Sequence, residues 1–195
     1  MKLEAPTQSI DFEAYDMHGK KISLSDYRGK SVILSFFRNT NCPFCLKRVF
    51  ELATHQKRWR KNGIEVITVF SSPAKQMHGF RKTNFQRFRI VPDPNLQVYQ
   101  LYGIEKSFSG LVKGLITRML TVLKGFSHGG KVEKNPHGLL LPADFLIDPQ
   151  GQIVEAWYGT NAADNIGLDR ILKFVDSAAK EFRAAQIEAH STRED

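Results

Sequence analysis

The feature that most constrains the fold is a pair of cysteines set between a buried strand and a helix. Val32–Phe37 is a continuous run of apolar, β-branched and aromatic residues, typical of a strand covered on both faces in a parallel sheet. After a short loop, the motif Cys42-Pro43-Phe44-Cys45 precedes apolar residues that recur at helical spacing from Leu46 to Ala53. The pattern predicts a helix that begins at the cysteine motif, where a proline is tolerated in the first turn.

The segments on either side predict an α/β chain. The cysteine helix ends before Asn62-Gly63, which is a C-cap signal, and the strand 64–70 follows. Strand, helix and strand in this order form a right-handed βαβ unit by default. The other expected elements are an N-terminal hairpin (10–15 and 21–24), a polar helix (73–86), a short edge strand (88–91), a helix (96–102), an amphipathic helix (108–124) within a helical insertion at about 104–138, two strands joined by a tight turn (143–147 and 152–158), and a long terminal helix from 166.

Composition sets the class of protein. A chain of 195 residues with 42% apolar and 25% charged side chains suits one domain over 1–195, with a core at about 5–185 and a frayed tail at 186–195. A formal charge of +8 permits an anionic substrate, but the basic clusters carry no nucleic-acid motif, so no nucleic-acid partner is expected. No apolar stretch is long enough for a membrane span. The start does not resemble a secretory signal, and two cysteines are too few for a disulfide scaffold, so we expect a cytoplasmic protein.

The spacing of Cys42 and Cys45 suits redox chemistry. A thiol reacts as the thiolate, and a helix N-terminus lowers the pKa of a thiol. Arg38, Lys47 and Arg48 add positive potential nearby. One cysteine can attack and the other can resolve the product as an intramolecular disulfide.

Two other interpretations of the cysteine pair stay open. A metal carrier would need further ligands, and with only two cysteines these would have to include a histidine such as His128 or His137. A binding module with an idle cysteine pair is the other alternative. No metal and no cofactor are expected in the favoured interpretation.

Three motifs, in order, resemble one known family. They are Phe36–Cys45 around the cysteines, Asp16–Lys30 upstream, and Leu141–Gly151 downstream. The first resembles the active-site loop of the alkyl hydroperoxide reductase/thiol-specific antioxidant (AhpC/TSA) family, in its peroxiredoxin-like branch. The second is similar to that family's D-x-x-G-x-x-x-x-L-x-D-x-x-G-K element, and the third to the P-x-x-F-L-I-D-x-x-G element of thioredoxin-fold proteins. The resemblance covers about residues 5–180.

The resemblance implies a thioredoxin-like fold, with a mixed central sheet and helices on both of its faces. It implies that the Leu141–Pro142 bond is cis and faces the cysteines, where its backbone can pair with a thiol or disulfide partner; a strand-initiating proline is the alternative. The implied activity is reduction of peroxides or disulfides through a Cys42/Cys45 dithiol–disulfide cycle. By resemblance to the dithiol oxidoreductases of this fold, we expect Cys42 to be the exposed attacking thiol and Cys45 the resolving one. A protein disulfide reductase without peroxidase activity is the alternative. The implied reductant is a thiol donor such as thioredoxin, glutaredoxin or glutathione, and a homodimer is compatible with the family.

The active-site loop departs from the usual peroxiredoxin pattern, P-x-x-x-T-x-x-C. If Cys45 aligns with the peroxidatic cysteine, then Cys42 replaces the threonine and Arg38 replaces the proline. Pro142 then stands where the family's activating arginine would be. Arg38, Thr40 and Pro142 are the candidate substrate-binding residues, and the reverse assignment of the two cysteines stays open for a peroxiredoxin.

Overall fold

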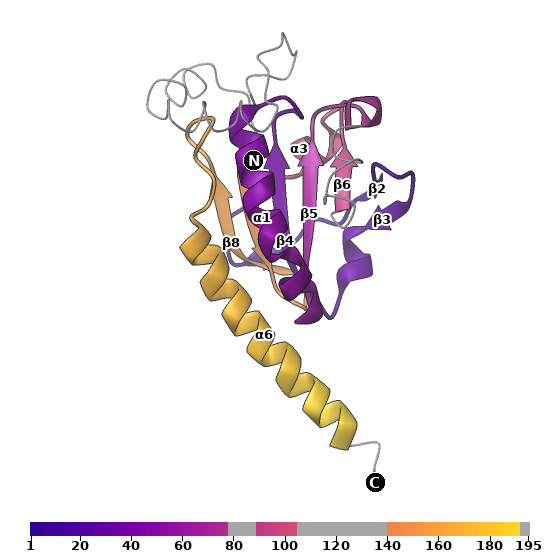
Figure 1. Ribbon diagram of the computed structural model, residues 1–195, viewed down its shortest axis with the longest axis vertical. Helices are drawn as coiled ribbons and strands as arrows, with labels where there is room; N and C mark the ends of the chain where they lie inside the picture. The colour runs from indigo at the N-terminus through magenta and orange to yellow at the C-terminus, as the bar shows by residue number, and fades with distance from the viewer. Residues whose placement is uncertain (78–88, 105–139, 192–195) are drawn as a thin grey trace.

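The computed structural model describes residues 1–77, 89–104 and 140–191 (Figure 1). Its centre is a six-stranded sheet with the strand order β1-β8-β7-β4-β5-β6, and a separate antiparallel pair, β2-β3, forms the predicted N-terminal hairpin. The strands are β1 (Thr7–Gln8), β2 (Glu13–Tyr15), β3 (Lys21–Ser23), β4 (Ser31–Phe37), β5 (Ile64–Phe70), β6 (Arg89–Pro92), β7 (Ala143–Ile147) and β8 (Gln152–Tyr158). The helical elements are η1 (Leu24–Tyr27), α1 (Pro43–Lys61), η2 (Ala74–Met77), α3 (Gln97–Leu101) and α6 (Leu168–Ser191).

The sheet is mixed, and β4 lies near its middle. β4 pairs in parallel with β5 and antiparallel with β7, and β5 pairs in parallel with β6. Every residue of β4 and β5 is buried, which explains why both strands are mostly apolar. The helix α1 connects β4 to β5, as the βαβ pattern predicts. It stops where Gly63 takes a φ of +74°, a left-handed conformation that glycine adopts without strain.

Successive β4 side chains point to opposite faces of the sheet, and each face has its own apolar cluster. Ile33 and Phe37 pack in the cluster that α1 and α6 cover, whereas Leu34 and Phe36 pack in the cluster that contains α3, η1 and residues of the N-terminal segment. In Figure 1, α1 crosses the sheet in front of β4. The prediction of an α/β fold with helices on both faces is therefore confirmed.

The terminal helix α6 is longer than the sequence pattern predicts. Its first half packs on the body through Ile171 and Val175, whereas nearly all residues from Lys180 onward are exposed, and Figure 1 shows this half extending away from the sheet. The helix continues to Ser191, into the segment 186–195 for which a frayed tail is predicted. Alanine, glutamate and glutamine favour helix, and no glycine or proline interrupts residues 168–191.

Two other predictions can be compared only in part. Of the predicted polar helix 73–86, the described residues include a short 3-10 helix, Ala74–Met77. The insertion at 104–138 with its amphipathic helix 108–124 lies almost wholly outside the described residues. The strand β1 was not predicted, because two residues that pair with the edge of β8 leave no periodic pattern.

The packing of α1 on the sheet predicts a large cost for shortening a side chain there. Leu52 is fully buried in the cluster between α1 and the sheet, so Leu52→Ala is expected to lower the free energy of unfolding by about 2–5 kcal/mol. Denaturant unfolding followed by far-UV circular dichroism measures this change. Lys57→Ala, at an exposed position of the same helix, is the control and should change stability by less than about 0.5 kcal/mol.

Candidate active site

Cys42 lies at the N-terminus of α1 and caps the helix. Its sulfur accepts a hydrogen bond from the backbone N–H of Cys45 at 3.4 Å, and its carbonyl accepts one from the N–H of Leu46 at 2.9 Å. Pro43 has no N–H to leave unsatisfied and occupies the first turn. The cap therefore directs the Cys42 sulfur at the unpaired amide groups of the helix, which favour negative charge.

The guanidinium of Arg38 supplies a full positive charge to the same sulfur. Arg38 Nη2 donates to Cys42 Sγ at 2.8 Å, and Arg38 is only 6% exposed. The carbonyl of Arg38 accepts hydrogen bonds from the backbone N–H and the hydroxyl of Ser71, which follows β5. The loop between β4 and α1 is thus fastened to the neighbouring strand end, and the guanidinium is held on Cys42.

These contacts separate the two thiols in acidity. Burial alone would raise the pKa of Cys42, but the hydrogen bond from Cys45, the charge of Arg38 and the cap N–H outweigh it and lower the pKa to about 6. Burial raises the pKa of Cys45 well above its usual value, and the adjacent negative charge on Cys42 raises it further. Near neutral pH, Cys42 is the thiolate and Cys45 the thiol.

The expectation of an exposed Cys42 is wrong. Cys42 is 3% exposed and Cys45 is 4% exposed. The reason is that the Cys42 sulfur turns inward to accept the cap N–H and the Arg38 guanidinium instead of projecting from the helix end. Reaction with a substrate therefore requires a local displacement at the site.

Thr40 connects the loop between β4 and α1 to Ser72, in the segment after β5. Its backbone N–H donates to the hydroxyl of Ser72 at 3.2 Å, and its own hydroxyl lies 3.5 Å from the same oxygen. These contacts anchor the loop that carries Arg38. A direct contact between Thr40 and substrate stays a prediction.

The Leu141–Pro142 peptide bond is trans, so the prediction of a cis bond is wrong. Within the described ranges, the cis bond is Ala5–Pro6 instead. Pro142 is buried directly before β7, and its carbonyl accepts from the N–H of Gly159 at 2.9 Å. It therefore starts the strand in ordinary extended geometry. The pairing of Phe36 with Ala143 still places Pro142 at the edge of the sheet where β4 leads into the cysteine loop.

Tyr99 supports the site, and no local sequence pattern indicates this role. The Tyr99 hydroxyl lies between the carbonyls of Phe37 and Val69, 3.0 Å from the latter. Tyr99 belongs to α3 and is fully enclosed. Because Phe37 is the last residue of β4 and Val69 the last but one of β5, this one hydroxyl connects the two strand ends that lead into the site loops.

A buried polar network on the α1 side of the sheet was also missed. Asp144 is fully buried in β7, where its carboxylate accepts from the Ser35 hydroxyl at 2.6 Å and from the Ile166 N–H at 3.0 Å. Burial raises the pKa of Asp144, and the charge of Arg48 opposes this. Arg48 in turn donates to the carbonyl of Ile166 at 2.7 Å. The sequence feature that could have indicated this network is Asp144, a single acidic residue within the otherwise apolar strand 143–147.

The metal alternative gains no support from the described part of the chain. Three or more histidine, cysteine or acidic side chains do not gather there in a geometry that would hold an ion. His128 and His137, the histidines considered as further ligands, lie outside the described residues. Within those same limits, the structure has no helix with both the length and the apolar character of a membrane span.

A cysteine pair at the first turn of a helix, beside a mixed sheet of this order, defines a thiol oxidoreductase of thioredoxin-like fold. Comparison with known proteins then gives the family. The AhpC/TSA family model matches residues 5–156, and the chain belongs to that family. The resemblance based on the sequence motifs is thereby confirmed.

The relatives include two kinds of thiol enzyme. The chain is 28% identical to the thiol-disulfide oxidoreductase ResA of Bacillus subtilis over 151 residues. This matched region covers 77% of this chain and 65% of ResA. It is 24% identical over 133 residues to peroxiredoxin Bcp of Escherichia coli, covering 67% of this chain and 83% of Bcp. The structure of peroxidoxin BcpB from Mycobacterium tuberculosis matches with a TM-score of 0.60 at 15% identity, covering 92% and 96% of the two chains. The relatives indicate thiol-dependent oxidoreductase activity, and the structural match confirms the fold.

The contact between Arg38 and Cys42 predicts a measurable shift in thiol acidity. Arg38→Met removes the charge while Cys42 stays buried, so the pKa of Cys42 should rise. Since the thiolate is the reactive form, alkylation by iodoacetamide at pH 7 should slow by roughly 10- to 100-fold. The pH dependence of alkylation in a Cys45→Ser background measures the pKa of Cys42 alone.

Arg58→Met, at an exposed position farther along α1, is the matched control and should leave the alkylation profile unchanged. An Arg38→Met profile that overlays the wild type would contradict the assignment of Arg38 as the group that stabilises the thiolate.

Proposed function

We propose that the chain reduces disulfides through a Cys42/Cys45 dithiol–disulfide cycle in which Cys42 attacks and Cys45 resolves. The observation that carries this proposal is the 2.8 Å contact between Arg38 and the Cys42 sulfur, together with the lowered pKa of Cys42. A thiolate near neutral pH is the nucleophile that disulfide exchange requires. The raised pKa of Cys45 suits a resolving thiol that stays protonated until the second step.

The cycle balances in two steps. The Cys42 thiolate attacks one sulfur of the substrate disulfide, whose S–S bond breaks, and the leaving thiolate takes a proton from solvent. Cys45 then loses its proton and attacks the Cys42 sulfur, which releases the second substrate thiol with that proton. The substrate gains two electrons, and the chain is left with a Cys42–Cys45 disulfide.

Peroxide reduction is the second candidate, and the same Arg38 contact supports it. The Cys42 thiolate would attack one peroxide oxygen, the O–O bond would break, and the leaving alkoxide or hydroxide would take up a proton. The resulting Cys42 sulfenic acid would condense with the Cys45 thiol to a disulfide and water. The raised pKa of Cys45 argues against Cys45 as the peroxidatic residue, so Cys42 would attack in either reaction.

Both reactions leave an oxidised pair that a thiol donor must reduce. The proposal therefore includes a reductant such as thioredoxin, glutaredoxin or glutathione, and a reducing compartment such as the cytoplasm, where those donors are kept reduced. A homodimer stays a prediction.

The two cysteine variants separate the roles of the sulfurs. Cys42→Ser should abolish turnover in insulin-disulfide reduction and leave no covalent product, because the nucleophile is gone. Cys45→Ser should also abolish turnover, but it should trap a mixed disulfide with the substrate through Cys42. Mass spectrometry of the non-reduced protein after mixing with substrate detects the trapped species.

Parallel stopped-flow oxidation of the reduced wild-type protein should decide between the two substrates. We expect faster reaction with a protein disulfide than with hydrogen peroxide or an organic hydroperoxide, and the reverse order would favour the peroxidase. The oxidoreductase proposal fails if Cys42 and Cys45 show no reversible two-electron couple in a redox titration and both cysteine variants keep full activity. The alternative of a binding module with an idle cysteine pair would then be favoured.

A further inference from the structure

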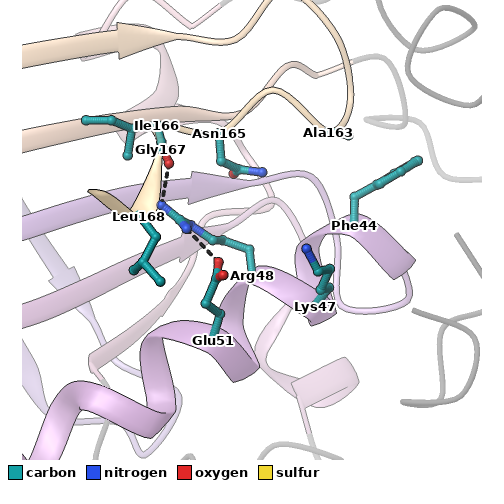
Figure 2. Close-up of a pocket in the computed structure, with 9 residues that line it drawn as sticks. All are labelled: Phe44, Lys47, Arg48, Glu51, Ala163, Asn165, Ile166, Gly167 and Leu168. Carbon is teal, nitrogen blue, oxygen red and sulfur yellow. Dashed lines mark hydrogen bonds and ion pairs between the residues drawn. The ribbon is translucent and has the colours of Figure 1, made fainter. Parts of the chain in front are cut away.

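A polar cavity of about 170 Å³ lies beside the cysteine helix, between α1 and the segment that leads from β8 into α6 (Figure 2). Four residues of α1 line it on one side, and residues 163 and 165–168 line it on the other. One of the four is Phe44, which stands between the two cysteines. Neither the disulfide cycle nor the peroxide reaction uses this cavity.

Arg48 brings a buried, unused donor to the cavity. Its side chain is 6% exposed; Nη1 contacts a Glu51 carboxylate oxygen at 2.6 Å, and Nη2 donates to the Ile166 carbonyl at 2.7 Å. The third nitrogen, Nε, is buried without a hydrogen-bond acceptor. A buried N–H without an acceptor is unfavourable, so an acceptor inside the cavity would stabilise it.

Asn165 brings the complementary group. Its side-chain oxygen Oδ1 is buried without a hydrogen-bond donor, and Asn165 lines the same cavity as Arg48 (Figure 2). A ligand that satisfies both side chains must therefore both accept and donate. Lys47 also lines the cavity, and its ammonium is a further donor to an acceptor there.

Charge and size narrow the ligand class. Lys47 and Arg48 are positive and Glu51 is negative, which leaves one net positive charge around the cavity. A carboxylate balances that charge and accepts from both cations, whereas the dianion of a phosphate monoester overbalances it and has no hydrogen for Asn165. An apolar cavity of about 150 Å³ holds a molecule the size of benzene, so about five or six non-hydrogen atoms of a ligand can lie inside it, which is the whole of glycolate or the glycine part of N-acetylglycine.

We propose that this cavity binds a small carboxylate that carries a neighbouring neutral N–H or O–H group. The carboxylate accepts from Arg48 Nε and the Lys47 ammonium, and the N–H or O–H donates to Asn165 Oδ1. Two sources share this chemistry: the C-terminal residue of a peptide, with its amide N–H, and a small hydroxy acid. Binding here does not depend on which substrate the cysteines reduce.

Isothermal titration calorimetry on the reduced full chain tests the proposal with four probes. N-acetylglycine represents a peptide end, glycolate represents a hydroxy acid, and acetate lacks the N–H or O–H. N-acetylglycine methyl ester lacks the charge. We expect one-site saturable binding of N-acetylglycine or glycolate, with acetate and the ester each weaker by roughly 10-fold or more.

Two variants connect the binding to this cavity and leave the Arg48 hydrogen bonds intact. Lys47→Met and Asn165→Leu should each weaken the preferred probe by roughly 10-fold or more. Lys57→Met, on the same helix but outside the cavity lining, should not change it. Circular dichroism and the unfolding midpoint verify that each variant is folded.

The pattern of probes also identifies the source. Tighter binding of N-acetylglycine favours a peptide end, and tighter binding of glycolate favours a hydroxy acid. The proposal is overturned if no probe saturates, if the ester binds as well as N-acetylglycine, or if folded Lys47→Met and Asn165→Leu proteins bind as the wild type does. The cavity would then hold only water.

Discussion

The contact between the Arg38 guanidinium and the Cys42 sulfur is the interaction on which the site depends. Both groups are buried, and a buried charge is strongly unfavourable unless an opposite charge and hydrogen bonds accompany it. The surrounding contacts secure that pairing: Ser71 fixes the Arg38 carbonyl, Thr40 is tied to Ser72, and Tyr99 joins the ends of β4 and β5. The sheet thus serves to hold one loop against one helix end.

The parts of the fold that were predicted correctly follow from local patterns. The strand 31–37 is mostly apolar because it is buried on both faces, and α1 begins at Pro43 and ends before Gly63, as helix-terminus chemistry requires. The cysteine pair at the start of α1 follows from the same boundaries. Sequence order alone therefore places two thiols and a nearby arginine at one edge of a sheet.

The parts that were missed depend on residues far apart in the chain. Tyr99 reaches the site across the 62 positions that separate it from Phe37, and Asp144 meets Ser35 across 109. The inward turn of Cys42 depends on where the Arg38 side chain lies, and the spacing of apolar residues in the sequence does not predict that position. Pro142 was assigned its cis bond by resemblance, whereas pairing with Gly159 gives it ordinary strand geometry.

The Arg38–Cys42 contact also bears on the energetics of electron transfer. When Cys42 enters a disulfide, it loses its negative charge, and the buried guanidinium no longer faces an anion. The reduced state is thereby favoured over the oxidised one, and the reduction potential of the couple becomes less negative. A mild donor then suffices to regenerate the dithiol, while the driving force that the dithiol offers to its own acceptor is correspondingly smaller.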